Sequence, residues 1–185
     1  MDMKQFIEDV RRTYPPYMLE GLRLQAGLTS PARRELALMG ALGLADESFE
    51  LADSLCSPEL AVQELGDCLY YVVALADGMC ALTALHELPV WETIPGPMNR
   101  DLVVHQQVGR LLGGSHGLLG MVKKSLFHGV AVDHEALRRR LVQVRDGLVT
   151  MAVALGLTLD DVMRANVEKR ERRYPRGFVE GGGVR

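Results

Sequence analysis

Residues 57–85 read SPELAVQELGDCLYYVVALADGMCALTAL, and this stretch decides the fold class. It opens with a Ser-Pro pair, which is typical of a helix start because serine caps free backbone N–H groups and proline suits the first helical position. From Cys68 to Leu85 the only charged residue is Asp77, so a helix here would be apolar nearly all round. Glu64 and Asp67 crowd the start of this run and no basic residue flanks it. These features favour a helix buried in a bundle over a membrane span.

The composition of the chain also favours helices packed on helices. The 185 residues are 48% hydrophobic and 24% charged but only 5% aromatic, and Leu, Ala and Val dominate rather than alternating β-branched and aromatic residues. We therefore expect a single all-α domain that covers residues 1–185. The net charge of -3 and the pI near 6.0 give no general attraction to nucleic acid or to anionic lipid. We expect neither a nucleic acid polymer nor a membrane as a partner.

The cysteines and the N-terminus predict a cytoplasmic protein. Cys56, Cys68 and Cys80 are odd in number and lack the close pairing of zinc sites and redox motifs, so we interpret them as free thiols in a reducing compartment. The first ten residues, MDMKQFIEDV, mix charges early and contain no apolar core of a secretory signal.

Helix start and stop signals divide the chain into segments. A first helix from residue 3 should end at Tyr14, before Pro15-Pro16. The glycines at 40 and 43, inside the next expected helix, suggest close helix contact or a kink. The expected helices are 3–14, 32–55 (after the cap Ser30 and Pro31), 57–85, 100–127, 133–155 and 158–173 (capped by Thr158), with a Pro-rich linker at 88–99.

The two halves of the chain resemble each other. Sliding the sequence by 71 residues places Gly43 on Gly114 and the Ser-Leu pair at 54–55 on the one at 125–126. We interpret this as a duplication, with an active repeat at about 32–85 and a degenerate repeat at about 100–155. The prediction is a four-helix-bundle core from two degenerate helical hairpin repeats, plus N- and C-terminal helices.

Four acidic residues form two pairs with three-residue spacing: Glu47 and Glu50, then Glu64 and Asp67. Like charges at this spacing share a helix face and repel by about 0.2–0.5 kcal/mol, and residues 35–99 contain no Lys or Arg to offset that. On neighbouring antiparallel helices the four carboxylates would surround one point, which suits Mg²⁺ or Mn²⁺. A di-iron site would need Glu-x-x-His, which does not occur.

The second repeat has Leu118 and Met121 where the first has its Glu-x-x-Glu pair. We therefore expect one metal site per chain, with Glu47, Glu50, Glu64 and Asp67 as the metal ligands.

The two acidic motifs, with the sequence around them, resemble those of a known enzyme family. GLADESFELAD at 43–53, followed by ELGDCLYYV at 64–72, is similar to the paired acidic motifs of MazG-like nucleoside triphosphate pyrophosphohydrolases. Residues 157–178 resemble the C-terminal segment of many members, and KKSLFHG at 123–129 resembles their lysine-rich loop, here displaced into the second repeat. The resemblance implies hydrolysis of a (d)NTP to the monophosphate and pyrophosphate, with the four acidic residues both catalytic and metal-binding. Glu47 or Glu50 could also act as general base.

The resemblance further implies a nucleotide-facing segment at 157–178, in which Asn166, Lys169, Arg173 and Tyr174 bind substrate. Trp91 could stack on a base, although a hydrophobic anchor is the simpler interpretation. Two alternatives remain open at this stage: a catalytically idle helical interaction module, and a phosphoribosyl-nucleotide pyrophosphohydrolase.

The apolar surface of the second half predicts a homodimer. Apolar residues occupy more than one face of the helix that begins near residue 100, and burying them between chains is favourable at about 25 cal/mol per Å² before association costs. They are Leu102, Val103, Val104, Val108, Leu111 and Leu112.

Overall fold

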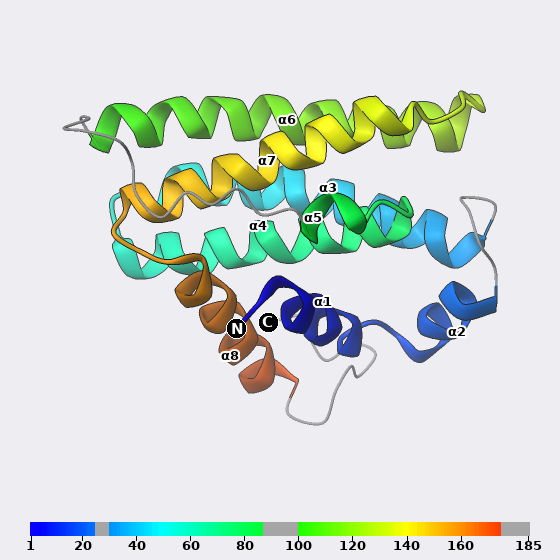
Figure 1. Cartoon of the computed structure of the whole chain (residues 1–185), viewed down its shortest axis with the longest axis horizontal. Helices are drawn as coiled ribbons and strands as arrows, with labels where there is room; N and C mark the ends of the chain where they lie inside the picture. Colours follow the sequence, from blue (N-terminus) through cyan, green and yellow to red (C-terminus); the bar gives the residue numbers. More distant parts are fainter. Residues whose placement is uncertain (25–29, 87–99, 175–185) are drawn as a thin grey trace.

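The computed structural model describes residues 1–24, 30–86 and 100–174. These residues form helices and connecting turns and contain no strand, so the predicted all-α fold is confirmed (Figure 1). The helices are α1 (Met3–Arg12), α2 (Pro16–Leu24), α3 (Pro31–Ser54), α4 (Pro58–Gly78), α5 (Thr83–His86), α6 (Arg100–His128), α7 (His134–Ala154) and α8 (Leu159–Arg173).

The long helices pair as two hairpins. Helix α3 packs along α4 and α6 packs along α7, while α3 also contacts α6 and α4 contacts α7. Helices α1, α2 and α8 lie on the opposite side of the α3–α4 hairpin from α6, where α8 and α1 pack on α4 and α2 packs on α3 (Figure 1). The α3–α4 hairpin is therefore covered on both sides. The origin of the two hairpins as repeats stays a prediction.

The helix ends largely follow the local signals. The Ser57 side chain accepts the backbone N–H of Leu60, and Thr158 forms a capping box with Asp161, so the expected starts of α4 and α8 are confirmed. Gly129 and Gly156 adopt φ values of +63° and +80° in the turns after α6 and α7, a region that glycine enters without steric cost.

Three local expectations are corrected. Helix α3 does begin at Pro31, but the Ser30 side chain makes no capping hydrogen bond. The helix expected to continue to residue 85 ends at Gly78, and the chain turns through Cys80 at φ 57° before the short helix α5. The second proline of Pro15-Pro16 begins α2 instead of only ending α1, because a proline is well accommodated in the first helical turn. Trp91 and the linker at 88–99 lie outside the described residues.

Two glycines let α3 and α4 approach closely. A side-chain carbon added at Gly40 would stand 2.4 Å from the backbone nitrogen of Leu75, and one at Gly78 would stand 2.5 Å from the nitrogen of Ala37. Neither position can hold a larger residue without separating the helices. The close contact predicted from the glycines of this hairpin is confirmed, and it sets the register in which the acidic residues face each other.

Part of the apolar face that motivated the dimer prediction is buried within the chain. Val103, Val104 and Leu111 are buried, the first two beside Ala154, whereas Leu102 is 58% exposed. Dimerisation therefore stays a prediction, and the apolar surface available for it is smaller than the sequence indicated.

Among the described residues, no single helix combines the length and apolar character needed to span a membrane, and one pair, α7 with α8, meets that test jointly but is bent by 99°.

Candidate metal centre and adjoining pocket

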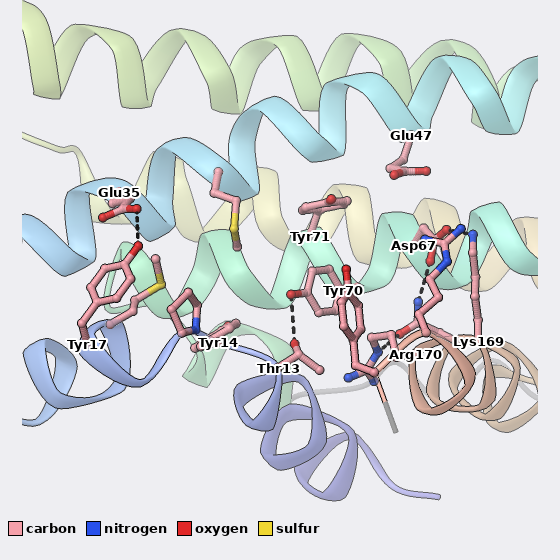
Figure 2. A pocket seen from close by; sticks show the side chains of 16 residues that line it. Thr13, Tyr14, Tyr17, Glu35, Glu47, Asp67, Tyr70, Tyr71, Lys169 and Arg170 are labelled. Carbon is pink, nitrogen blue, oxygen red and sulfur yellow. Dashed lines mark hydrogen bonds and ion pairs between the residues drawn. The ribbon is translucent and has the colours of Figure 1, made fainter. Parts of the chain in front are cut away.

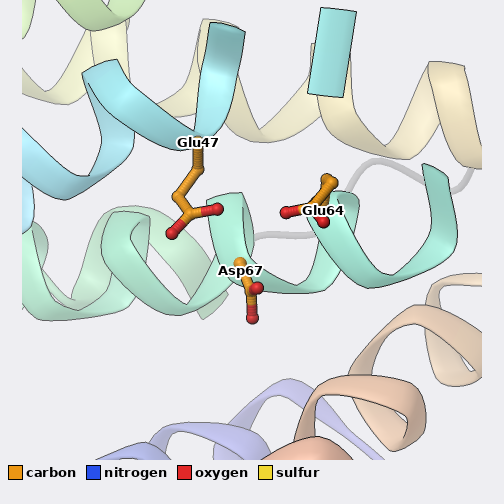
Figure 3. Close-up of side chains that lie close together, drawn as sticks. All are labelled: Glu47, Glu64 and Asp67. Carbon is orange, nitrogen blue, oxygen red and sulfur yellow. The ribbon is translucent and has the colours of Figure 1, made fainter. Parts of the chain in front are cut away.

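Three carboxylates from the α3–α4 hairpin converge (Figure 3). Glu47 extends from α3 toward α4, where Glu64 and Asp67 lie one turn apart, and one oxygen of each lies within 4.8 Å of the others. We call Glu47, Glu64 and Asp67 the carboxylate triad. The structure thus brings together three of the four predicted ligands.

Glu50 is the predicted ligand that stands apart from the triad. It lies three residues beyond Glu47 on α3, which turns it about 60° around the helix axis, and its side chain is exposed. Its charge nevertheless acts on the triad, since Glu50 is among the groups that raise the pKa of Glu47. Its role as a ligand stays a prediction.

The triad is strongly unfavourable for three negative charges. Burial, the Asp67 charge and a hydrogen bond with Glu64 raise the pKa of Glu47 to about 8. The Oε2 atom of Glu64 is buried and has no hydrogen-bond partner among the described residues. A buried acceptor without a partner costs about 1–3 kcal/mol. A divalent cation fits this donor set, because it would satisfy the Glu64 oxygen and offset the mutual repulsion with the hard oxygen ligands that Mg²⁺ and Mn²⁺ prefer.

Helix α8 closes the site over Asp67. A side-chain carbon added at Gly66 would stand 2.8 Å from the Cβ of Asn166, so α8 rests directly on α4 at this point. The Nδ2 atom of Asn166 donates to Asp67 Oδ1 at 2.7 Å, and the Lys169 ammonium forms an ion pair with Asp67 Oδ2. Residues 35–99 contain no Lys or Arg, and the positive charge beside Asp67 comes instead from Lys169, 102 residues further along the chain.

A cavity of about 320 Å³ adjoins the triad, with Glu47 and Asp67 in its wall (Figure 2). One end is charged and the other is aromatic and thioether-lined, and Tyr17 donates to Glu35 at 2.7 Å at the far end. The remaining lining residues are Thr13, Tyr14, Pro15, Met18, Met39, Tyr70, Tyr71, Asn166, Lys169, Arg170, Arg173 and Tyr174.

All four residues predicted to bind substrate lie in this wall, but they differ in what they can offer. Asn166 is 1% exposed and Lys169 contacts Asp67, so both are engaged with the triad. Arg173 is exposed and Tyr174 is half-buried at the rim. The predicted cluster is thus split between an inner pair and an outer pair.

Sequence reasoning missed Arg170 and the aromatic end of the cavity. Tyr70, whose hydroxyl lies 3.0 Å from Thr13 Oγ1, and Tyr71 both come from α4, and Tyr71 packs on Gly43 of α3. The tyrosine pair directly after the Glu-x-x-Asp motif was the available signal. The lining residues from the α1–α2 turn and from α2 carried none, because they reach the site only through tertiary packing.

Comparison of the chain with protein-family models, with curated proteins and with solved structures returned no match. The fold and the site define an all-α protein with an acidic candidate metal centre, and any narrower class depends on the chemistry that the site supports.

Proposed function

We propose that this protein is a divalent-cation-dependent nucleotide pyrophosphohydrolase that cleaves a (d)NTP between its α and β phosphates, giving the monophosphate and pyrophosphate. The observation that carries the proposal is the meeting of the carboxylate triad with a cavity that is charged at one end, where Lys169 and Arg173 lie, and aromatic at the other. The resemblance of residues 43–53 and 64–72 to MazG-like enzymes is consistent with it.

The triad would hold Mg²⁺ or Mn²⁺ through Glu47, Glu64 and Asp67, with Glu50 as a further proposed ligand. A cation bound there supplies neutralisation of the phosphate oxygens and a water of lowered pKa. Glu47 or Glu50 would accept the proton of the attacking water. Burial and acidic neighbours raise the pKa of Glu47 to about 8, and a cation at the triad would lower it again and so favour the ionised carboxylate that this role requires.

The basic groups of α8 would bind the phosphate chain. Lys169 pairs with Asp67, so a cation at the triad would weaken that pair and allow the ammonium to turn to a phosphate oxygen. Arg173 lies in the wall of the cavity with an exposed side chain, where a guanidinium can bind phosphate through two parallel N–H donors.

The aromatic end of the cavity would take the nucleobase. Tyr70 and Tyr71 form an edge-to-face pair with ring centroids 5.0 Å apart, and Met18 and Met39 add polarisable thioethers to the wall. At the far end Tyr17 donates to Glu35, so that carboxylate can accept an N–H group of a base. A nucleotide is likewise charged at its phosphate end and planar and aromatic at its base.

The direct test measures product release from a panel of ribo- and deoxynucleoside triphosphates with Mg²⁺ or Mn²⁺, scoring pyrophosphate against orthophosphate. We expect pyrophosphate, abolished by chelation and by Glu64→Gln or Asp67→Asn. The matched controls are Glu20→Gln and Asp53→Asn, two exposed carboxylates on neighbouring helices, which should retain full activity.

The alternatives predict other outcomes of the same assay. A catalytically idle module gives no product with any nucleotide, and a phosphoribosyl-nucleotide pyrophosphohydrolase releases pyrophosphate from its own substrate but not from the free triphosphates. Orthophosphate as the first product would contradict cleavage between the α and β phosphates.

A further inference from the structure

Arg170 on α8 is a buried cation that is fixed from several directions. The residue is 9% exposed, and its guanidinium lies over the ring of Tyr70, 5.3 Å from the centroid, with Phe6 at 5.8 Å. Its Nη2 atom donates to Asp9 Oδ2 at 2.7 Å and its Nη1 atom to the backbone oxygen of Asp9 at 3.2 Å. Helix α1 therefore holds the guanidinium in one orientation.

The remaining contact of Arg170 runs toward the carboxylate triad. Its Nε atom donates to Asn166 Oδ1 at 2.8 Å. A guanidinium has donors only, so the amide must present its oxygen to Arg170. This leaves the amide nitrogen facing Asp67, whose Oδ1 accepts at 2.7 Å. Asn166 is 1% exposed, so water has little access to compete for either bond.

We propose that Arg170 is a positioning residue for Asp67, acting through Asn166 and held in place by Asp9. The inference rests on the proposed function in one respect, that Asp67 is a ligand of the catalytic cation. Without the guanidinium, the buried Asn166 oxygen loses its donor and the amide is no longer held in one orientation, so its N–H group positions Asp67 less firmly. Partners that orient a ligating carboxylate in this way typically change metal affinity by about 10–100-fold when removed.

The role differs from that of a general structural cation. A lysine at this position keeps the positive charge but has a single nitrogen, which cannot bond Asp9 and Asn166 in the fixed fork of arginine. Charge alone would thus survive Arg170→Lys, whereas orientation of the amide would not. Asp9→Asn keeps the shape of the anchor and only weakens it.

The test measures binding of Mn²⁺ alone to the full chain, by electron paramagnetic resonance of the free ion, without nucleotide. Because Arg170 acts one bond further from the ion than a direct partner of the ligand, we expect Arg170→Lys to weaken Mn²⁺ binding by up to about 10-fold, and Asp9→Asn to weaken it by a smaller factor. Arg164→Lys is the matched control: it alters the exposed ion pair with Asp160 on the same helix and should leave Mn²⁺ affinity unchanged. Melting temperatures of all variants separate loss of fold from loss of position.

Wild-type Mn²⁺ affinity in both Arg170→Lys and Asp9→Asn would overturn the inference, and if Arg170→Lys does not fold, Asp9→Asn decides alone. Mn²⁺ binding that does not respond to Glu64→Gln would also overturn it, since the ion would then lie elsewhere. Loss of Mn²⁺ affinity in the expected order, in a protein that releases no pyrophosphate from any nucleotide, would reject the proposed function and support the positioning role.

Discussion

Replacing Gly66 by alanine should separate α8 from the carboxylate triad. The added carbon would stand 2.8 Å from Asn166 Cβ and 3.1 Å from the backbone oxygen of Val162, so α8 must move. Overpacking of this kind costs about 1–3 kcal/mol, and loss of the Asn166 bond to the Asp67 carboxylate adds about 1.5–3 kcal/mol. Alanine returns about 1 kcal/mol of helix propensity. The expected net loss is roughly 1.5–5 kcal/mol, from the same principles.

The matched control is Gly113→Ala on α6, where nothing lies within 4 Å of the added carbon. That variant should gain about 0.5–1 kcal/mol, because the same helix propensity is gained without a clash. Urea unfolding of both variants, with Mn²⁺ binding as a second measurement, checks the reasoning. If Gly66→Ala were as stable as Gly113→Ala and bound Mn²⁺ equally well, the close seating of α8 on α4 would be refuted.

Three further predictions concern the site itself. The pKa of Glu47 is raised to about 8 from an ordinary 4.5, so the folded protein binds this proton more tightly than the unfolded chain does. Without metal, the stability that this proton contributes is lost as pH rises from about 4.5 through 8. The melting temperature measured in chelator should fall over this range, and Glu47→Gln should flatten the curve. Tyr17→Phe, which removes the hydroxyl bonded to Glu35, should raise KM for some nucleobases several-fold and leave Mn²⁺ affinity unchanged; identical KM changes for every base would argue against a base-binding end. Titration with Mn²⁺ and a non-hydrolysable nucleotide should saturate at one nucleotide per chain, since Leu118 and Met121 replace the first acidic pair in the second hairpin, and two equivalents would contradict this.

The parts of the fold set by local chemistry could be predicted from the sequence. The starts of α4 and α8 depend on side chains within three residues of the cap, and the close approach of α3 and α4 follows from glycine at position 40. The end of α4 at Gly78 could not be predicted in the same way, because the apolar pattern continues beyond it. After Gly78 the chain turns, and the short helix α5 packs on α7.

The site was predictable to the extent that it is built from one hairpin. Glu47, Glu64 and Asp67 belong to sequential helices, so their spacing alone indicates a meeting point. Glu50 illustrates the limit: a three-residue spacing leaves about 60° between side chains, enough to leave one carboxylate exposed while the other is half-buried.

The contacts that position the triad come from much further away. Arg170 reaches Asp9 across 161 residues, and Lys169 reaches Asp67 across 102. No periodicity or motif relates such pairs, because they depend on how α1 and α8 dock on α4. The prediction that the acidic pairs lack a cation was correct for their own region of the chain and incomplete for the folded protein.

The proposed reaction is attack of water on the α-phosphorus of a nucleoside triphosphate at the carboxylate triad. Hydrolysis in water enriched in oxygen-18, followed by mass spectrometry of the products, tests it most directly, with Glu64→Gln as the inactive control and Asp53→Asn, an exposed carboxylate on α3, as the active one. We predict that the label enters the nucleoside monophosphate and is absent from pyrophosphate. Label in pyrophosphate or in orthophosphate, or turnover that survives Glu64→Gln, would contradict the account.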